Sequence, residues 1–468
     1  MRTRSTSIDV LFVNWRDASH PDGGGSERYV HHMAEGLAAT GLAVTMFCAA
    51  HDRAPADEEI GGVRIVRRGG RLGVYLRALL FVGTHRARLV VDVQNGLPFG
   101  SSLVTRSPVV VLVHHVHREQ WPIVFGRLGG AIGWWLESVA APRIYRRSRY
   151  VTVSGVTAGE LSDLGVDVGR ITVVPNGLEP APAVAAVRSA EPRLAILGRL
   201  VPHKRVEHAF EVVARLQPRW PGLRLSVVGE GWWEQELRAA AEKLGVAELV
   251  DFKGFLDEQA KHEELARAWV HLCPSVKEGW GLVVSEAGSH GVPTVGYRAA
   301  GGLRESILDG RTGLLVDDLD ELTAAVDRLL TDDRLRTRMG TEAVRHAASY
   351  NWPASVTAFA GVLSAAVGDS AVGAVVEDVA VRAAVLRPGG VDGGVAAGRS
   401  RLVGVGGGGD ADHGDDAESG ADDEGDQRTG ERLHSLTRFR RGRRRSVTVD
   451  GRQRIHNAAA ATAPSAQA

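Results

Sequence analysis

The chain has 468 residues, and its 56 lysines and arginines balance its 56 aspartates and glutamates. This length exceeds one ordinary domain, and the zero formal charge excludes a chain-wide basic bias toward nucleic acid. Two cysteines, Cys48 and Cys273, are too few for a disulfide framework or a cysteine zinc site. No apolar run approaches the roughly 18 residues of a membrane-spanning helix, and no signal-peptide pattern precedes the first predicted strand, so we expect a cytoplasmic protein.

Short apolar runs alternate with helical patterns through the first part of the chain. Residues 10–13 predict a strand, 23–25 a glycine turn and 27–39 a helix. Further strands are predicted at 42–49, 89–93, 109–113, 150–154 and 171–174. This alternation is typical of a parallel sheet with crossover helices. We therefore expect residues 1–180 to form one Rossmann-like domain.

A second unit of the same kind follows a proline-containing stretch. Residues 178–192 contain three prolines and few large apolar side chains, which favours a hinge between domains. Beyond it, strands are predicted at 194–197, 223–228, 250–252, 270–272 and 293–296, and helices at 206–216, 235–244 and 322–330. We expect a second doubly wound domain over residues 190–345 and one more helix over 350–367.

The composition changes in the last part of the chain, residues 368–468. Residues 403–409 are nearly all glycine, 410–426 are strongly acidic and 428–445 are strongly basic. Charge blocks and low complexity of this kind cannot bury a core, so we predict a mostly disordered tail. A solvated linker, a misread reading frame and a basic segment that binds anionic lipid or nucleic acid are all open interpretations.

Two carboxylates flank a glycine-containing turn in the second half. Glu278 precedes the turn, Glu286 lies eight residues later, and a helix is predicted to begin near Gly281. A helix N-terminus offers N–H groups to an anion, and carboxylates accept hydrogen bonds from sugar hydroxyls. The arrangement fits a ligand with hydroxyls at both ends and phosphates between them, which describes a nucleotide sugar. The alternative is a helix-capping acid beside a surface acid.

Two cations follow the predicted strand at 194–197. Arg199 and Lys204 lie in the loop at its carboxyl end, the edge where parallel sheets bind ligands. Together they would neutralise a diphosphate, each through a charged hydrogen bond of roughly 1.5–3 kcal/mol. The alternative is a pair of solvated loop residues.

Three histidines, His114, His115 and His117, follow the strand at 109–113. A zinc site is one interpretation and core or capping histidines are another. Asp318 and Asp320 form an Asp-x-Asp pattern just before a predicted helix, and an N-cap is the favoured role there.

In order, these motifs resemble those of retaining glycosyltransferases of family 4, which have the GT-B fold of two Rossmann-like domains facing a cleft. The resemblance covers residues 8–366. It rests on Gly198-Arg199 with Lys204, Val-Val-Gly-Glu-Gly at 227–231, Phe-Lys-Gly-Phe at 252–255, Glu278 with Glu286, Gly301-Gly302 with Glu305, and Gly-Arg-Thr-Gly at 310–313.

The resemblance implies a role for each candidate residue. Arg199 and Lys204 would hold the donor diphosphate, Glu278 the hydroxyls of the transferred sugar, and Glu286 the ribose hydroxyls. Either His114 or His115 would face the reacting centre. Further donor contacts would come from the glycine loop and from the two loops of the second domain, at Gly24, Gly25, Phe255, Gly281, Leu282 and Val283. The helix at 350–367 would cross back to the first domain.

The implied activity is transfer of a hexose-type sugar from a UDP- or GDP-linked donor to an acceptor hydroxyl, with retention of anomeric configuration and without a metal or other cofactor. Cell-envelope glycan or glycolipid synthesis is the expected context, with a glycan or lipid-linked acceptor and no nucleic acid. An epimerase or phosphorylase of the same fold and a non-catalytic nucleotide-sugar-binding module are the alternatives.

One segment suggests contact with the inner face of the plasma membrane. Trp134 and Trp135 are followed by Arg143, Arg146 and Arg147. Aromatic and basic residues on one helix can lie on an anionic bilayer surface. The alternative is an ordinary domain helix with a hydrated basic face.

Overall fold

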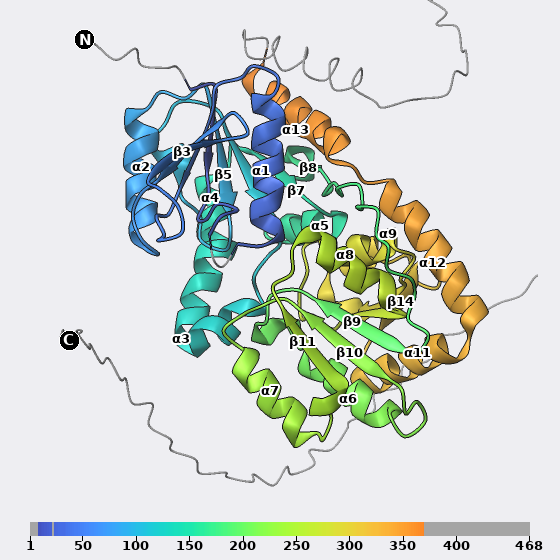
Figure 1. The fold of residues 1–468 in the computed structure, drawn as a ribbon. Helices are drawn as coiled ribbons and strands as arrows, with labels where there is room; N and C mark the ends of the chain where they lie inside the picture. The colour runs from blue at the N-terminus through green and yellow to red at the C-terminus, as the bar shows by residue number, and fades with distance from the viewer. Residues whose placement is uncertain (1–7, 21–22, 369–468) are drawn as a thin grey trace, which may run out of the picture. The chain divides into compact units, whose positions relative to one another are not determined.

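A computed structural model describes residues 8–20 and 23–368 (Figure 1). The predicted disorder of the tail and its alternative interpretations therefore lie outside the described residues, apart from Gly368. Within the described part of the chain, no helix is both long enough and apolar enough to span a bilayer.

The first sheet has eight strands in the order β3-β4-β2-β1-β5-β6-β7-β8. Its parallel strands are buried on both faces at the centre, as β6 shows with five consecutive buried apolar residues, Val-Val-Val-Leu-Val. The strands are β1 Val10–Val13, β2 Val44–Cys48, β3 Asp57–Ile60, β4 Val63–Arg67, β5 Leu89–Gln94, β6 Val109–Val113, β7 Arg149–Thr152 and β8 Ile171–Val173.

One edge of this sheet differs from the prediction. β3 runs antiparallel to β4, and neither strand was predicted from the sequence. Gly61 and Gly62 join them, both with positive φ (58° and 77°), which is the geometry of a tight hairpin turn. β3 reads Asp-Glu-Glu-Ile, so its charged, half-exposed pattern lacks the apolar run on which the prediction relied.

Helices cover both faces of the first sheet. α1 (Gly25–Ala38) packs on one face, and α2 (Gly73–Thr84), which was not predicted, packs on the other. α3 (Gln120–Trp135) continues through a π-helical turn at Leu136–Ala140 into α4 (Ala141–Ile144), and α5 (Gly155–Asp163) follows β7. Arg143 lies on the continuation of the helix that carries Trp134 and Trp135, whereas Arg146 and Arg147 lie in the turn before β7. The predicted aromatic and basic helix therefore extends only as far as Arg143.

The second sheet has six parallel strands in the order β11-β10-β9-β12-β13-β14. Its strands are β9 Arg193–Leu197, β10 Arg224–Val228, β11 Val250–Gly254, β12 Val270–Cys273, β13 Thr294–Tyr297 and β14 Gly313–Val316. Its helices are α6 Glu207–Leu216, α7 Glu234–Lys243, α8 Glu258–Arg267, α9 Leu282–Ser289, α10 Leu303–Ser306, α11 Leu319–Thr331 and α12 Asp333–Ala348. Two separate sheets with crossover helices confirm the predicted α/β class with two Rossmann-like lobes.

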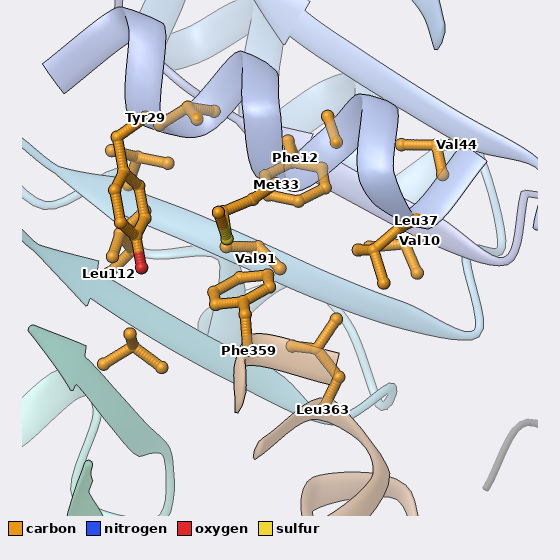
Figure 2. Packing of buried hydrophobic residues seen from close by; sticks show 14 of the residues in the cluster. Val10, Phe12, Tyr29, Met33, Leu37, Val44, Val91, Leu112, Phe359 and Leu363 are labelled. Atoms are coloured by element: carbon orange, nitrogen blue, oxygen red, sulfur yellow. The ribbon is translucent and has the colours of Figure 1, made fainter. Parts of the chain in front are cut away.

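The last described helix, α13 (Trp352–Val367), belongs to the core of the first lobe. Phe359 is fully buried there, with its ring centroid 6.1 Å from that of Phe12. Figure 2 shows Phe359 reaching from α13 toward Met33 of α1 and Val91 of the sheet, with Leu363 one turn further along α13. The chain thus returns from the second lobe to complete the hydrophobic core of the first.

Asp318 caps α11, as the sequence predicted, because its Oδ1 accepts a hydrogen bond from the Glu321 amide at 2.9 Å. We expect Asp318→Ala to cost about 1 kcal/mol, since an N-cap of this type contributes that much. Calorimetry of the full chain should show the transition of the second lobe lowered by roughly 2–4 °C. Glu242→Ala, which removes an exposed acid late in α7, is the matched control, and an equal shift in both variants would contradict the capping role.

Candidate functional site

The predicted cations and the first predicted acid meet at the carboxyl ends of β9 and β12. Arg199, Lys204 and Ser275 line one pocket there. Lys204 Nζ donates a hydrogen bond to Glu278 Oε1 at 2.5 Å, and Ser275 Oγ donates to the same oxygen at 2.7 Å. Sequence analysis assigned Lys204 to the donor diphosphate and Glu278 to the transferred sugar, and the structure places these two side chains in direct contact.

The charge of Glu278 depends on this pairing. Burial alone would raise the pKa of its carboxyl, but the charge and hydrogen bond of Lys204, together with the Ser275 hydroxyl, outweigh burial and hold the pKa below its ordinary value of 4.5. Glu278 is therefore ionised at neutral pH. Its attraction to Lys204 is complete above pH 4.5 and is lost as the pH falls through the lowered pKa.

The second predicted acid, Glu286, lies on α9 and is held by two cations. Lys261 Nζ on α8 donates to Glu286 Oε1 at 2.9 Å, and Arg28 on α1 of the first lobe is 3.4 Å from the same oxygen. Sequence reasoning missed both cations. Lys261 lies in a charged helix, Glu-Gln-Ala-Lys-His-Glu-Glu, whose pattern gives no sign that this lysine is buried.

Glycines in the turn between Glu278 and Glu286 let its backbone lie close to the first lobe. Gly281 has φ +87° at the N-cap of α9, a conformation that favours glycine. A Cβ at Gly279 would lie 2.5 Å from the carbonyl oxygen of His114. The turn therefore fits against the first lobe only because it has no side chain there. Leu282 and Val283 follow as the first residues of α9, where amides have no acceptor within the helix.

The glycine loop of the first lobe faces the same region. A Cβ at Gly25 would lie 3.1 Å from a methyl carbon of Leu282, and one at Gly24 would lie 3.5 Å from Nε of Arg199. The loop therefore lies against both the start of α9 and the predicted diphosphate-binding arginine. Phe255, the other predicted donor contact, is 77% exposed to solvent, and its amide donates a hydrogen bond to Glu230 Oε1 at 3.2 Å.

The three histidines have distinct environments. His114 is buried edge-on against Tyr29, and burial lowers its pKa to about 4. Burial also lowers the pKa of His115 well below the ordinary value, and its Nε2 lies 3.2 Å from Gln120 Oε1. Both rings are therefore neutral at pH 7.

His117 contacts a residue that sequence reasoning missed. Its Nδ1 lies 2.9 Å from Oε1 of Glu137, which is buried and also accepts a hydrogen bond from Trp121 Nε1 at 2.7 Å. The rings of His115 and His117 are 4.1 Å apart. Glu137 thus anchors the histidine turn to α3. Among the described residues, no group of three or more His, Cys, Asp or Glu side chains is arranged to hold a metal ion.

Polar contacts join the lobes around these residues. Glu305 accepts hydrogen bonds from the amides of Gly155 and Val156, at the N-terminus of α5, at 3.0 and 2.7 Å. Lys277, which precedes Glu278 in the sequence, forms an ion pair with Glu160 on α5. Two carboxylates, several cations and a helix N-terminus are therefore gathered where the lobes meet, a combination that suits an anionic ligand bearing hydroxyls.

Two family models match this chain. The Glycosyltransferase Family 4 model matches residues 23–181, and the Glycosyl transferases group 1 model matches residues 181–346. A GDP-mannose-dependent alpha-(1-6)-phosphatidylinositol monomannoside mannosyltransferase of Mycolicibacterium smegmatis is 36% identical over 223 residues, which is 44% of this chain. The match spans only 56% of that relative's length.

Two further proteins match over most of both chains. Glycogen synthase of Mycobacterium tuberculosis is 28% identical over 402 residues, covering 76% of this chain and 94% of the synthase. The solved structure of sucrose-phosphate synthase from Thermosynechococcus elongatus has a TM-score of 0.63 at 20% identity, covering 75% of this chain and 96% of that one. The two family models together match residues 23–346, and with the two-sheet architecture they show that the chain belongs to the family 4, group 1 glycosyltransferases with the GT-B fold.

Proposed function

We propose that this protein transfers a sugar from a nucleoside diphosphate sugar to an acceptor hydroxyl, with retention of the anomeric configuration. The cluster of Lys204, Glu278 and Ser275 at the ends of β9 and β12 carries the proposal. Because Lys204 and Glu278 lie side by side, the ammonium group can bind a diphosphate while the carboxylate binds a hydroxyl of the adjoining sugar.

Each part of the nucleotide sugar is then assigned to residues that bind it. Arg199 and Lys204 bind the diphosphate, Glu278 binds hydroxyls of the sugar, and Glu286 binds the ribose hydroxyls. The glycine loop at Gly24 and Gly25 and the amides at the start of α9 lie along the phosphates. The backbone beside Phe255 borders the nucleobase, and His114 or His115 faces the reacting centre as a neutral ring.

The chemical step places negative charge on the departing diphosphate. The bond between the anomeric carbon and the diphosphate oxygen breaks, and the acceptor oxygen bonds to that carbon on the same face. The acceptor proton passes to an oxygen of the leaving phosphate, so no carboxylate nucleophile is required. Arg199, Lys204 and the α9 amides stabilise the developing charge, and closure of the lobes excludes water.

For the substrates we extend the chemistry of the named relatives. The mannosyltransferase relative uses GDP-mannose and a phosphatidylinositol monomannoside. We infer a hexose-type donor linked to GDP or UDP, used without a metal, and a glycan or lipid-linked acceptor of the cell envelope. A lipid-linked acceptor would place the enzyme at the inner face of the plasma membrane.

A two-step assay tests this function. Thermal-shift screening with UDP, GDP, ADP and their sugars identifies the donor, and nucleotide release is then followed with and without candidate acceptors. A transferase releases nucleotide faster when acceptor is present. Isomerisation of the donor without nucleotide release would indicate an epimerase, and binding without any turnover would indicate a binding module.

Glu286→Gln should weaken binding of the nucleoside diphosphate by about 10–100-fold, because charged hydrogen bonds to the ribose hydroxyls are worth about 1.5–3 kcal/mol. Isothermal titration with the diphosphate and separately with inorganic pyrophosphate checks this. Pyrophosphate has no ribose, so its affinity should stay close to that of the unmodified protein. An equal loss for both ligands, or no loss for either, would contradict the ribose assignment.

A further inference from the structure

The loop that follows β10 is held by the backbone on both sides of it. The Gly229 amide donates a hydrogen bond to the carbonyl oxygen of Gly254, the last residue of β11, at 2.9 Å. The Leu200 amide, in the loop after β9, donates to the carbonyl oxygen of Glu230 at 2.9 Å. A Cβ at Gly231 would lie 2.1 Å from the carbonyl oxygen of Leu200, so this close approach requires glycine. Glu230 therefore projects from a backbone whose position is fixed.

Glu230 lies between the two ends of the proposed nucleotide site. Its backbone pairs with Leu200, which directly follows Arg199, the arginine proposed to bind the donor diphosphate. Its side chain reaches the opposite way, and Oε1 accepts a hydrogen bond from the Phe255 amide at 3.2 Å. That amide belongs to the backbone proposed to border the nucleobase. The carboxylate of Glu230 therefore lies where the edge of a bound base would come.

The carboxylate of Glu230 sets a requirement on that base. The residue is exposed, and the group that donates to its Oε1 is an uncharged amide rather than a cation. An ionised carboxylate has no proton to donate and accepts hydrogen bonds at both oxygens. A base that fits here therefore needs N–H groups facing Glu230. Beside them it needs a carbonyl oxygen that can replace Oε1 as the acceptor of the Phe255 amide.

Guanine meets both parts of this requirement. Its O6 atom accepts a hydrogen bond, and the neighbouring N1–H and N2–H groups point in the same direction, so that one carboxylate can accept from both. Uracil has a single N–H between two carbonyls, and its second carbonyl would face the carboxylate oxygens. Adenine has one amino group beside a ring nitrogen that accepts. Hypoxanthine keeps O6 and N1–H but lacks the amino group, so it forms one hydrogen bond fewer than guanine.

We propose that Glu230 determines the base specificity of this enzyme by selecting guanine, so that the donor is a GDP-linked sugar. The Phe255 amide donates to O6, and the Glu230 carboxylate accepts from N1–H and N2–H. The exposed ring of Trp232, two residues after Glu230, offers a flat apolar surface on which a purine can stack. This inference rests on the proposed function, because it takes the nucleotide to lie along the loops that follow β9, β10 and β11.

Isothermal titration of the full chain with four nucleotides tests the selection. The probes are GDP, UDP, ADP and inosine diphosphate, which carries hypoxanthine and differs from GDP only in the missing amino group. GDP should bind about tenfold or more tightly than UDP and ADP, because a bidentate pair discriminates between bases by roughly that factor. Inosine diphosphate should bind more weakly than GDP, since it cannot fill both carboxylate oxygens.

Glu230→Gln should lower the affinity for GDP by about tenfold and bring it close to that for inosine diphosphate, because glutamine keeps one acceptor oxygen and replaces the other with an amino group. Glu236→Gln, which removes an exposed acid from α7, is the matched control and should retain the preference for GDP. Inorganic pyrophosphate has no base, so it should bind both variants like the unmodified protein and report that their diphosphate site is folded.

The outcomes separate this inference from the proposed function. UDP or ADP binding as tightly as GDP would overturn the selection of guanine while leaving a nucleotide-sugar site in place. An unchanged ratio of GDP to inosine diphosphate affinity in Glu230→Gln would overturn the role of this carboxylate. Failure of every nucleoside diphosphate to bind would overturn both the inference and the proposed function.

Discussion

Replacing Lys204 with alanine is expected to lower the rate of nucleotide release from the best donor by about 10²–10³-fold, because a single donor aimed at developing negative charge contributes that much. The variant loses a cation for the diphosphate, and Glu278 keeps its contacts with the uncharged Ser275 Oγ and Cys273 Sγ. The buried carboxylate then loses the charge that keeps its pKa low.

Steady-state turnover with the donor selected by thermal shift measures this effect. Lys243→Ala, which removes an exposed lysine from the end of α7, is the matched control and should turn over like the unmodified protein. A Lys204→Ala rate within threefold of the control would remove this lysine from the chemistry.

Truncation of Phe359 to alanine should cost about 3–5 kcal/mol of stability, since it empties a fully buried aromatic site. The loss falls on the first lobe although Phe359 lies after the second lobe in sequence, because α13 packs against β1 and α1 (Figure 2). Calorimetry of the full chain should show the first-lobe transition lowered strongly.

Phe125→Ala serves as the comparison, since that ring is 52% exposed on α3 and its removal should change stability little. If the two variants unfolded at the same temperature, α13 would not be an integral part of the first-lobe core.

Much of the fold follows from patterns within single elements. A short run rich in β-branched residues such as Val-Val-Val-Leu-Val favours a strand buried on both faces, and helical periodicity between such runs favours a parallel sheet. The same logic placed Arg199, Lys204 and Glu278 near one another, because the carboxyl ends of parallel strands share one edge. The β3–β4 hairpin was not predicted because β3 is charged and half-exposed and the two strands are short, although β4 buries Val63, Ile65 and Val66.

The rest of the site depends on contacts between distant parts of the chain. Arg28 and Lys261 reach Glu286 from different lobes and helices, and no local spacing links them. Glu137 is twenty residues from His117, and a π-helical turn sets its position. Pairings of this kind arise from tertiary packing. The sequence shows that these residues are charged, but it does not show which residues they contact.

The most direct test is a crystal structure of the full chain with the nucleoside diphosphate, GDP or UDP, that gives the larger thermal shift. The diphosphate oxygens should lie about 2.7–3.2 Å from side-chain nitrogens of Arg199 and Lys204, with the ribose hydroxyls on Glu286. A nucleotide bound at another edge of the second sheet, with these three side chains not touching it, would contradict the account.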